Sequence, residues 1–229
     1  IGSLFGLSMT GDAFNLFVFL EISALSSITL IALGAGQDRR ALIAAYNYLI
    51  IGAVGATFYV IGVGYLYGVT GTLNLVDMVD RLSALETGQS AALTGLAFML
   101  AGIMVKAAIF PVHVWLPSAY SYAPSAVASL LAAVATKVAI YFFARLLFGV
   151  FAQVTGLVDL FLLYVLLPLS AIAIFYGTIA AIYQSDIKRL LAQSSIAQIG
   201  YITFAFALNS QAGLASGFIH IFNHALIKG

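Results

Sequence analysis

The chain has 229 residues, of which 63% are hydrophobic and only 7% are charged. Soluble domains carry about 25% charged residues, so this composition excludes a soluble protein and indicates an integral, multi-pass membrane protein. The net charge of +1 gives no reason to expect nucleic-acid binding, and the lack of cysteine excludes disulfides and thiolate chemistry.

The apolar segments predict an all-α transmembrane helix bundle, because a spanning helix needs about 20 apolar residues. We expect the chain to be an excerpt of a longer polypeptide, since it begins with Ile1 and stops at Gly229 inside an apolar segment. The predicted spans cover residues 1–9 (the end of one span), 13–35, 41–68, 91–110, 125–148, 157–183, 190–208 and 212–229.

Local signals mark the ends and contacts of these spans. Asp12 suits the N-cap of a helix, and the spacing Gly64-x-x-x-Gly68 would let two helices approach closely. Pro168 predicts a kink in its span. Residues 69–89 form a polar interval in which a short amphipathic helix is expected at the membrane interface. Its apolar residues at helical spacing are Leu75, Val76, Val79 and Leu82.

Residues 104–145 read as a helix that is interrupted and then resumes. Lys106 lies before the interruption and Lys137 lies in the second helix; the interrupting prolines are Pro111, Pro117 and Pro124. At membrane depth, backbone freed by proline persists only where protein or a water-filled cavity surrounds it. Ionisable groups inside a span usually face an ion path or a partner. The two lysines beside the break therefore predict a charge-conducting route.

Counting the spans assigns the loops to the two sides of the membrane. The loops around 36–40, 111–124 and 184–189 share one side, which holds Arg39, Arg40, Lys188 and Arg189. The other side holds Asp77, Asp80, Arg81, Glu86 and Asp159, with Arg145 as an interfacial anchor near its edge. Because Lys and Arg concentrate in cytoplasmic loops, the first side is predicted to be cytoplasmic.

Glu21 lies inside a span without a charged residue on its own helix. An ionised carboxylate alone in lipid is too costly, so Glu21 is expected to be protonated or paired. The pair is either a fixed structural one or one that opens and closes to change the proton affinity of a lysine. Burial disfavours the charged amine and a nearby carboxylate favours it, so Lys106 could exchange protons in such a pair. Snorkelling toward the break is the alternative for Lys106.

Lys137 lies too deep in its helix to snorkel easily, and the hydroxyls of Thr136 and Tyr141 could bond it. His220, His224 and Lys228 follow at a spacing of four residues, which places them on one helix face. Histidine changes protonation near physiological pH and is a natural relay group. A His-x-x-x-His pair could also bind a metal, but no further ligand accompanies it, and we expect no metal.

Further polar residues could line a proton path. His113 has a structural role or a place on the path, and a second set, Ser194, Gln198 and Tyr201, shares one face and either binds water or packs. The sequence has no glycine-rich nucleotide loop, Ser-His-Asp arrangement or carboxylate pair at hydrolase spacing. We therefore expect no cofactor and no active site for covalent chemistry.

Around these residues the sequence resembles the antiporter-like membrane subunits shared by Mrp-type Na⁺/H⁺ antiporters and respiratory complex I. The resemblance covers nearly the whole chain. The motif sequences are most similar to the Mrp D subunit, with the M and N subunits of complex I and membrane-bound hydrogenase subunits as alternatives. The motifs are TGDAFNLFVFLEIS, YGVTGTLNL, VKAAIFPVHVWLPSAY, TKVAIYFFAR, SDIKRLLAQSSIAQIGY and HIFNHALIK.

The resemblance implies about fourteen spans in the whole protein, built from two inverted five-helix repeats, the first at about 1–150 and part of the second at about 151–229. It implies that Glu21 pairs with Lys106 and that protons pass by way of Lys137, His220 and His224 to a charged residue beyond the chain. It also implies a multi-pass location in a bacterial or archaeal cell membrane, with other membrane subunits as partners.

The leading hypothesis is a proton-translocating subunit of a cation/proton antiporter, a transporter rather than an enzyme. The alternatives are a proton-pumping subunit of NADH:quinone oxidoreductase, or of a related hydrogenase, and a non-conducting assembly scaffold. The sequence leaves open whether Na⁺ is carried.

Overall fold

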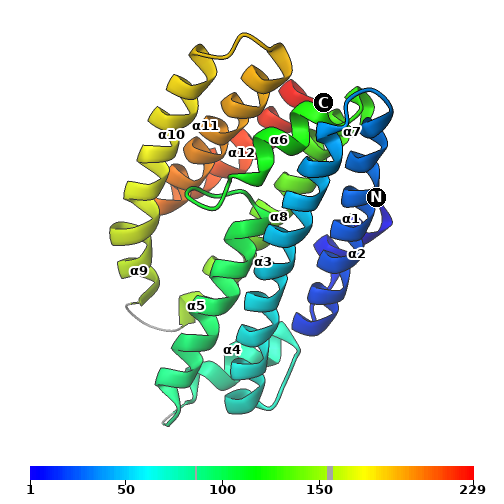
Figure 1. The fold of residues 1–229 in the computed structure, drawn as a ribbon. Coiled ribbons are helices and arrows are strands. Elements are labelled where there is room, and N and C mark those ends of the chain that lie inside the picture. The colour runs from blue at the N-terminus through cyan, green and yellow to red at the C-terminus, as the bar shows by residue number, and fades with distance from the viewer. Residues whose placement is uncertain (86, 154–156) are drawn as a thin grey trace.

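The computed structural model describes residues 1–85, 87–153 and 157–229, and within these the chain is helical, without a β-strand (Figure 1). The α-helices are α1 (Gly2–Met9), α2 (Ala13–Ala32), α3 (Arg40–Thr70), α4 (Leu75–Ser83), α5 (Gln89–Lys106), α6 (Trp115–Tyr122), α7 (Ser125–Leu130), α8 (Thr136–Arg145), α9 (Leu157–Phe161), α10 (Leu167–Ile182), α11 (Ile187–Ala207) and α12 (Gln211–Lys228).

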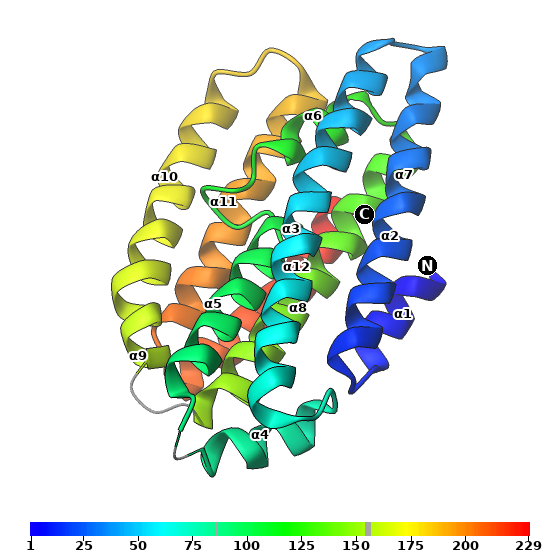
Figure 2. The ribbon, with the colours of Figure 1, turned by 60° about the horizontal axis from the view of Figure 1, so that its bottom comes forward.

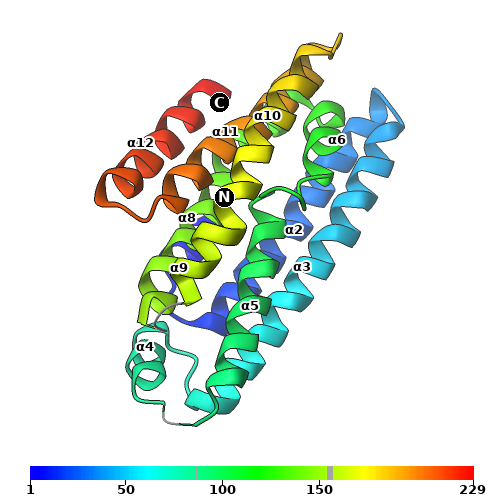
Figure 3. The same ribbon diagram turned by 90° about the vertical axis from the view of Figure 1, so that its left-hand side faces the viewer.

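Six helices of the described chain are long and apolar enough to cross a membrane, which confirms the all-α, multi-span prediction. They cover Ala13–Gly36, Arg40–Thr70, Gln89–Lys106, Ser125–Val150, Val158–Ile182 and Ile187–Ala207. The last begins three residues before its predicted start, because Asp186 caps α11 by accepting from the Arg189 N–H at 3.0 Å. Helix α12 falls outside this set, since its polar residues dilute its apolar ones, and it packs beside α11 (Figure 3).

The antiparallel pair α3 and α5 packs at close range through glycines. A Cβ added to Gly95 would lie 3.0 Å from the Gly62 carbonyl oxygen, and one added to Gly55 would lie 3.1 Å from that of Gly102. The expected contact at Gly64 and Gly68 is not found among the described residues, because a Cβ built at either one meets no atom of another part of the described chain within 4 Å. Those two glycines face away from the α3–α5 interface.

The interrupted helix is confirmed, although part of its break is helical. Helix α5 ends at Lys106, residues 107–114 form turns, and α6 follows where the sequence predicts only a loop. Pro117 is compatible with α6 because it is the third residue of that helix, where the backbone nitrogen has no intrahelical acceptor. The break therefore leads into a short helix that packs against α3 and α11.

Two of the spanning helices contain π-helical turns. Leu131–Ala135 (η2) separates α7 from α8, and Leu162–Leu166 (η5) precedes α10. Pro168, where a kink was predicted, stands in the first turn of α10, directly after this π-turn. A third π-turn, Leu146–Val150 (η3), continues the α8 span.

One end of the bundle gathers the three loops that were predicted to share a side (Figure 1). The guanidinium carbons of Arg40 and Arg189 lie 4.9 Å and 5.5 Å from the ring centroid of Tyr122, and Arg189 also donates to its hydroxyl. Lys188 donates to the Ala123 carbonyl at 3.3 Å. These contacts tie together the α2–α3 loop, the C-terminal end of α6 and the start of α11.

The opposite end carries α4, which lies across the end of the bundle (Figure 2). The predicted amphipathic helix is confirmed, but its buried residues are Leu75, Met78 and Leu82, whereas Val76 is exposed. Glu86, predicted for this side, lies outside the described residues.

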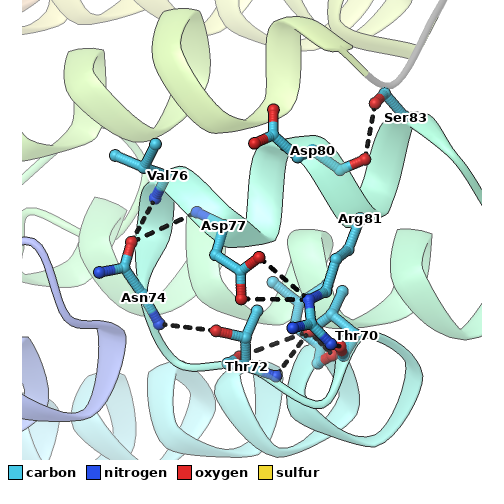
Figure 4. A network of polar contacts seen from close by, with 9 residues as sticks. Thr70, Thr72, Asn74, Val76, Asp77, Asp80, Arg81 and Ser83 are labelled. Atoms are coloured by element: carbon cyan, nitrogen blue, oxygen red, sulfur yellow. Dashed lines mark hydrogen bonds and ion pairs between the residues drawn. The ribbon is translucent and has the colours of Figure 1, made fainter.

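Arg81 fastens α4 to the end of α3 (Figure 4). It pairs with Asp77 at 3.1 Å and donates to the Thr70 carbonyl at 2.9 Å. Two hydrogen bonds, the stronger effect coming from Arg81 and the weaker from Thr72, lower the pKa of the Asp77 carboxyl below its usual value of 3.8. Nearby, Asp12 caps α2 as predicted, accepting from the Asn15 N–H at 2.7 Å.

Candidate functional site

Glu21 and Lys106 lie on two different helices and do not form a direct ion pair in the described chain. Glu21 is on α2 and Lys106 is the last residue of α5. Glu21 Oε1 and Lys106 Nζ are both buried and have no hydrogen-bond partner among the described residues. The ion pairs found within 4 Å in the described chain do not include them. Both groups are therefore buried at these atoms and unpaired in this structure.

A small polar cavity of about 20 Å³ lies beside Lys106, between α2, α3, α5, α6 and α8. This volume is enough for one water molecule. Its polar lining, besides Lys106, consists of Ser23, Ser27, Tyr48, Tyr120, Thr136 and the indole of Trp115. The cavity therefore extends from Lys106 to the residue that precedes Lys137.

Aromatic side chains fix the backbone at the break beside Lys106. Trp115 donates from Nε1 to the Val105 carbonyl at 2.9 Å, and the same carbonyl accepts from the Ala108 N–H at 3.2 Å at the end of α5. The Tyr48 ring stands edge-on to Trp115 with centroids 4.8 Å apart, and Lys106 Nζ lies 5.8 Å from the Tyr48 centroid. The ammonium thus has an aromatic face as a neighbour.

Lys137 is held by the π-turn that precedes it. Its Nζ donates to the Ala132 carbonyl and lies 3.4 Å from Thr136 Oγ1. The neighbouring carbonyl, that of Leu131, accepts from the Tyr120 hydroxyl at 3.1 Å. Two side chains therefore satisfy carbonyls of a turn whose hydrogen bonding departs from the α-helical pattern, as is frequent at functional sites.

The expected contact between Lys137 and Tyr141 is absent among the described residues, because Tyr141 points outward with 38% of its surface exposed. Arg145, expected as an interfacial anchor, donates to the Thr10 carbonyl at 2.7 Å and ties α8 to the end of α1.

Two of the three ionisable residues of α12, His220 and Lys228, lie against polar groups of α11. His220 Nε2 lies 2.7 Å from Gln198 Oε1, and its ring stands edge-on to Tyr201 at 6.2 Å between centroids. Lys228 Nζ donates to Ser194 Oγ at 3.1 Å and to the Leu191 carbonyl at 2.9 Å. The predicted set on α11 therefore contacts α12: Ser194 contacts Lys228, and Gln198 and Tyr201 contact His220.

His224 occupies the middle of this row and is fully buried. Its ring stacks on that of His220 at 6.4 Å between centroids, and neither of its nitrogens has a partner within the described chain. Helix α12, which carries His224, packs against η2 and α8, the two elements that position Lys137. The row therefore begins near Lys137 and leads along the α11–α12 interface.

His113 lies apart from this row, in the turns between α5 and α6. It is buried between the rings of Phe110 and Tyr176, with centroid distances of 5.1 Å and 5.2 Å. Its Nδ1 has no hydrogen-bond partner in the part of the chain that the structure describes. The structure does not bring His113 to the cavity beside Lys106.

A profile of the family described as NADH:quinone oxidoreductase/Mrp antiporter, transmembrane, matches residues 10–229. The chain is 46% identical over 226 residues to the N subunit of NADH-quinone oxidoreductase from Desulforudis audaxviator, covering 99% of this chain and 44% of that protein. It is 33% identical over 224 residues to the D subunit of the Na⁺/H⁺ antiporter from Alkalihalophilus pseudofirmus, covering 97% of this chain and 44% of that protein. The chain thus spans less than half the length of these relatives.

Solved structures of multisubunit membrane complexes contain the same fold. A chain of an archaeal membrane-bound sulfane sulfur reductase matches with a TM-score of 0.88 and 34% identity, over 99% of this chain and 45% of that one. A chain of the Mrp complex from Dietzia sp. matches with a TM-score of 0.84 and 29% identity, over 99% of this chain and 41% of that one.

Proposed function

Because the chain belongs to the NADH:quinone oxidoreductase/Mrp antiporter transmembrane family, we propose that it translocates protons as part of a membrane subunit of a multisubunit cation/proton antiporter. The observation that carries this proposal is the unpaired Lys106 amine beside a cavity that polar side chains line, together with the unpaired Oε1 of Glu21. Burying a carboxylate and an amine without hydrogen bonds is energetically costly. A pair whose separation changes during transport would explain why both groups are kept.

The proposed path begins at this pair. When Lys106 moves toward Glu21, the carboxylate favours the protonated amine; when they separate, the amine releases its proton into the cavity. A water in the cavity and the Thr136 hydroxyl then lead to Lys137. His224 and His220 would carry the proton onward between α11 and α12, because an imidazole can accept a proton at one nitrogen and release it from the other.

Replacing Lys106 with Ala in the full-length protein, within its complex in sealed vesicles, tests the proposal. Proton flux should fall roughly a hundredfold or more, since positioned proton-transfer groups contribute that much or more. Arg39→Ala, which removes an exposed charge from the α2–α3 loop, should leave flux unchanged. Retained flux in well-assembled Lys106→Ala protein would contradict the proposed role.

A second candidate is a proton-pumping subunit of a redox-linked complex, favoured by the 46% identity to an oxidoreductase N subunit against 33% to an antiporter D subunit. The two candidates differ in what drives transport. In inverted vesicles, Na⁺ added outside should exchange for H⁺ and make the interior more alkaline in the first case. In the second case, addition of NADH with a quinone should acidify the interior. An inert scaffold predicts instead that Glu21→Gln and Lys137→Ala disturb assembly but leave flux intact.

The proposal implies partners and a repeat organisation. Other membrane subunits would adjoin the chain, as its structural matches come from multisubunit complexes. Residues 1–150 would form the first inverted repeat and residues 151–229 part of the second, with the path continuing into the remainder of the protein.

A further inference from the structure

Tyr120, on α6, stands between two cavities. The inner cavity is the one beside Lys106, of about 20 Å³. The outer cavity is more open, has a volume of about 230 Å³ and lies between α7, η2, α11 and α12. Of the described residues, Tyr120 is the one that lines both.

The outer cavity is suited to hold water and reaches the basic end of the bundle. Its polar lining consists of Ser125, Ser129, Ser195, Lys188 and Lys228. Lys188 belongs to the end where the three loops meet. Ala132, whose carbonyl binds Lys137, also lines this cavity. Water that enters beside Lys188 therefore reaches Ala132, which binds Lys137, and Tyr120, which borders the cavity beside Lys106.

The Tyr120 ring is held in place by its hydroxyl. The side chain is 5% exposed, and the hydroxyl donates to the Leu131 carbonyl at 3.1 Å, with Thr136 Oγ1 at 3.5 Å. The acceptor belongs to the π-turn, so the position of the ring and the shape of that turn are coupled. Water could replace the hydroxyl at this carbonyl if the ring turned away.

We propose that Tyr120 is a gate between the two cavities, and that its displacement from the Leu131 carbonyl connects water beside Lys188 with Lys106. Delivery of protons by this route rests on the proposed function, but the gating of water does not. Tyr120 is a positioning residue in this scheme: it controls access to Lys106 and need not carry a proton itself.

Cysteine labelling can measure access to each cavity, because this chain has no cysteine of its own. In the full-length protein within its complex, Ser129→Cys reports on the outer cavity and Ser27→Cys on the inner one. A small water-soluble methanethiosulfonate is applied, and mass spectrometry of the two peptides gives the labelling rates. With Tyr120 intact, Ser129→Cys should react readily and Ser27→Cys slowly.

Removing the gate should open the inner cavity. Tyr120→Ala should bring the labelling rate of Ser27→Cys close to that of Ser129→Cys, and Tyr120→Phe should raise it roughly fivefold, the population shift that one neutral hydrogen bond controls. Tyr59→Phe is the matched control, because Tyr59 is equally buried, donates to the Ala13 carbonyl at 3.0 Å and lines neither cavity.

Equal labelling of both cysteines with Tyr120 intact, or no change at Ser27→Cys in either Tyr120 variant, would overturn the gate. If Tyr120→Ala does not assemble, the labelling rate of Ser27→Cys in Tyr120→Phe, compared with that in Tyr59→Phe, still tests the gate. The readouts separate the two proposals: loss of flux in Lys106→Ala bears on proton transport, whereas the labelling rates bear on water access alone.

Discussion

The two buried lysines have different surroundings, which suit different tasks. Lys106 Nζ has no hydrogen-bond partner in the described chain and borders a cavity, so its protonation can follow the distance to Glu21. Lys137 Nζ is bonded to the Ala132 carbonyl and lies near Thr136. A relay at Lys137 therefore has a fixed position, and only its proton needs to move.

Lys137→Arg separates charge from proton release. A guanidinium keeps the positive charge and can still donate to the Ala132 carbonyl, but it does not lose its proton at any physiological pH. Assembly should therefore be retained, while proton flux in vesicles should fall roughly a hundredfold. The reverse exchange on the same helix, Arg145→Lys, should keep flux, because an ammonium can also donate to the Thr10 carbonyl. Normal flux through Lys137→Arg would mean that Lys137 supplies charge alone.

The sequence alone predicts those site residues whose type is rare in their surroundings. Glu21 and Lys106 are conspicuous because each is the lone charge in its apolar segment, and Lys137 because it lies near the middle of one. The α12 row follows from a spacing of four. Tyr48 and Tyr120 were missed, since the chain has 12 tyrosines and an apolar segment tolerates a tyrosine anywhere. Which hydroxyl meets which carbonyl depends on how separate helices pack.

Among the elements, too, features set by neighbouring residues are predictable from the sequence, whereas features set by packing between helices are not. Asp12 caps α2 through a contact three residues away, and this local chemistry predicts the boundary from the sequence. Asp186 caps α11 over the same distance, but the predicted start at residue 190 missed it. The glycine contact between α3 and α5 is not predictable, because 21 glycines offer many pairs and only the packed helices select Gly55, Gly62, Gly95 and Gly102. Helix α6 was hidden by three prolines, of which one lies inside it.

Gly62→Ala should destabilise the α3–α5 pair. The added Cβ would lie 2.5 Å from the Gly95 carbonyl oxygen, a backbone atom that cannot rotate away. Overpacking of this kind costs about 1–3 kcal/mol, which should lower the midpoint of thermal unfolding in detergent. Gly64→Ala is the matched control two residues away, where the Cβ meets nothing within 4 Å and alanine favours the helix. Equal midpoints for the two variants would argue against close packing at Gly62.

At the scale of the whole molecule, the charges are divided between the two ends of the bundle. Arg40, Lys188 and Arg189 converge on the end of α6 and the residue after it, while α4, with Asp77 paired to Arg81, covers the opposite end (Figures 1 and 2). The outer cavity opens on the basic end, beside Lys188. The orientation in the membrane thus decides from which compartment water would reach Tyr120.

The basic end is predicted to face the cytoplasm, because Lys and Arg are retained on that side during insertion. Two exposed positions report on it: Tyr183, 82% exposed at the turn before α11, and Val76, 72% exposed on α4. A membrane-impermeant maleimide should label Val76→Cys in intact cells and Tyr183→Cys only in inverted vesicles. The opposite pattern would reverse the orientation and place the entrance beside Lys188 on the outer side. Because both cysteines lie outside the bundle core, neither should alter proton flux, and flux measured in the same vesicles shows that the labelled protein is folded.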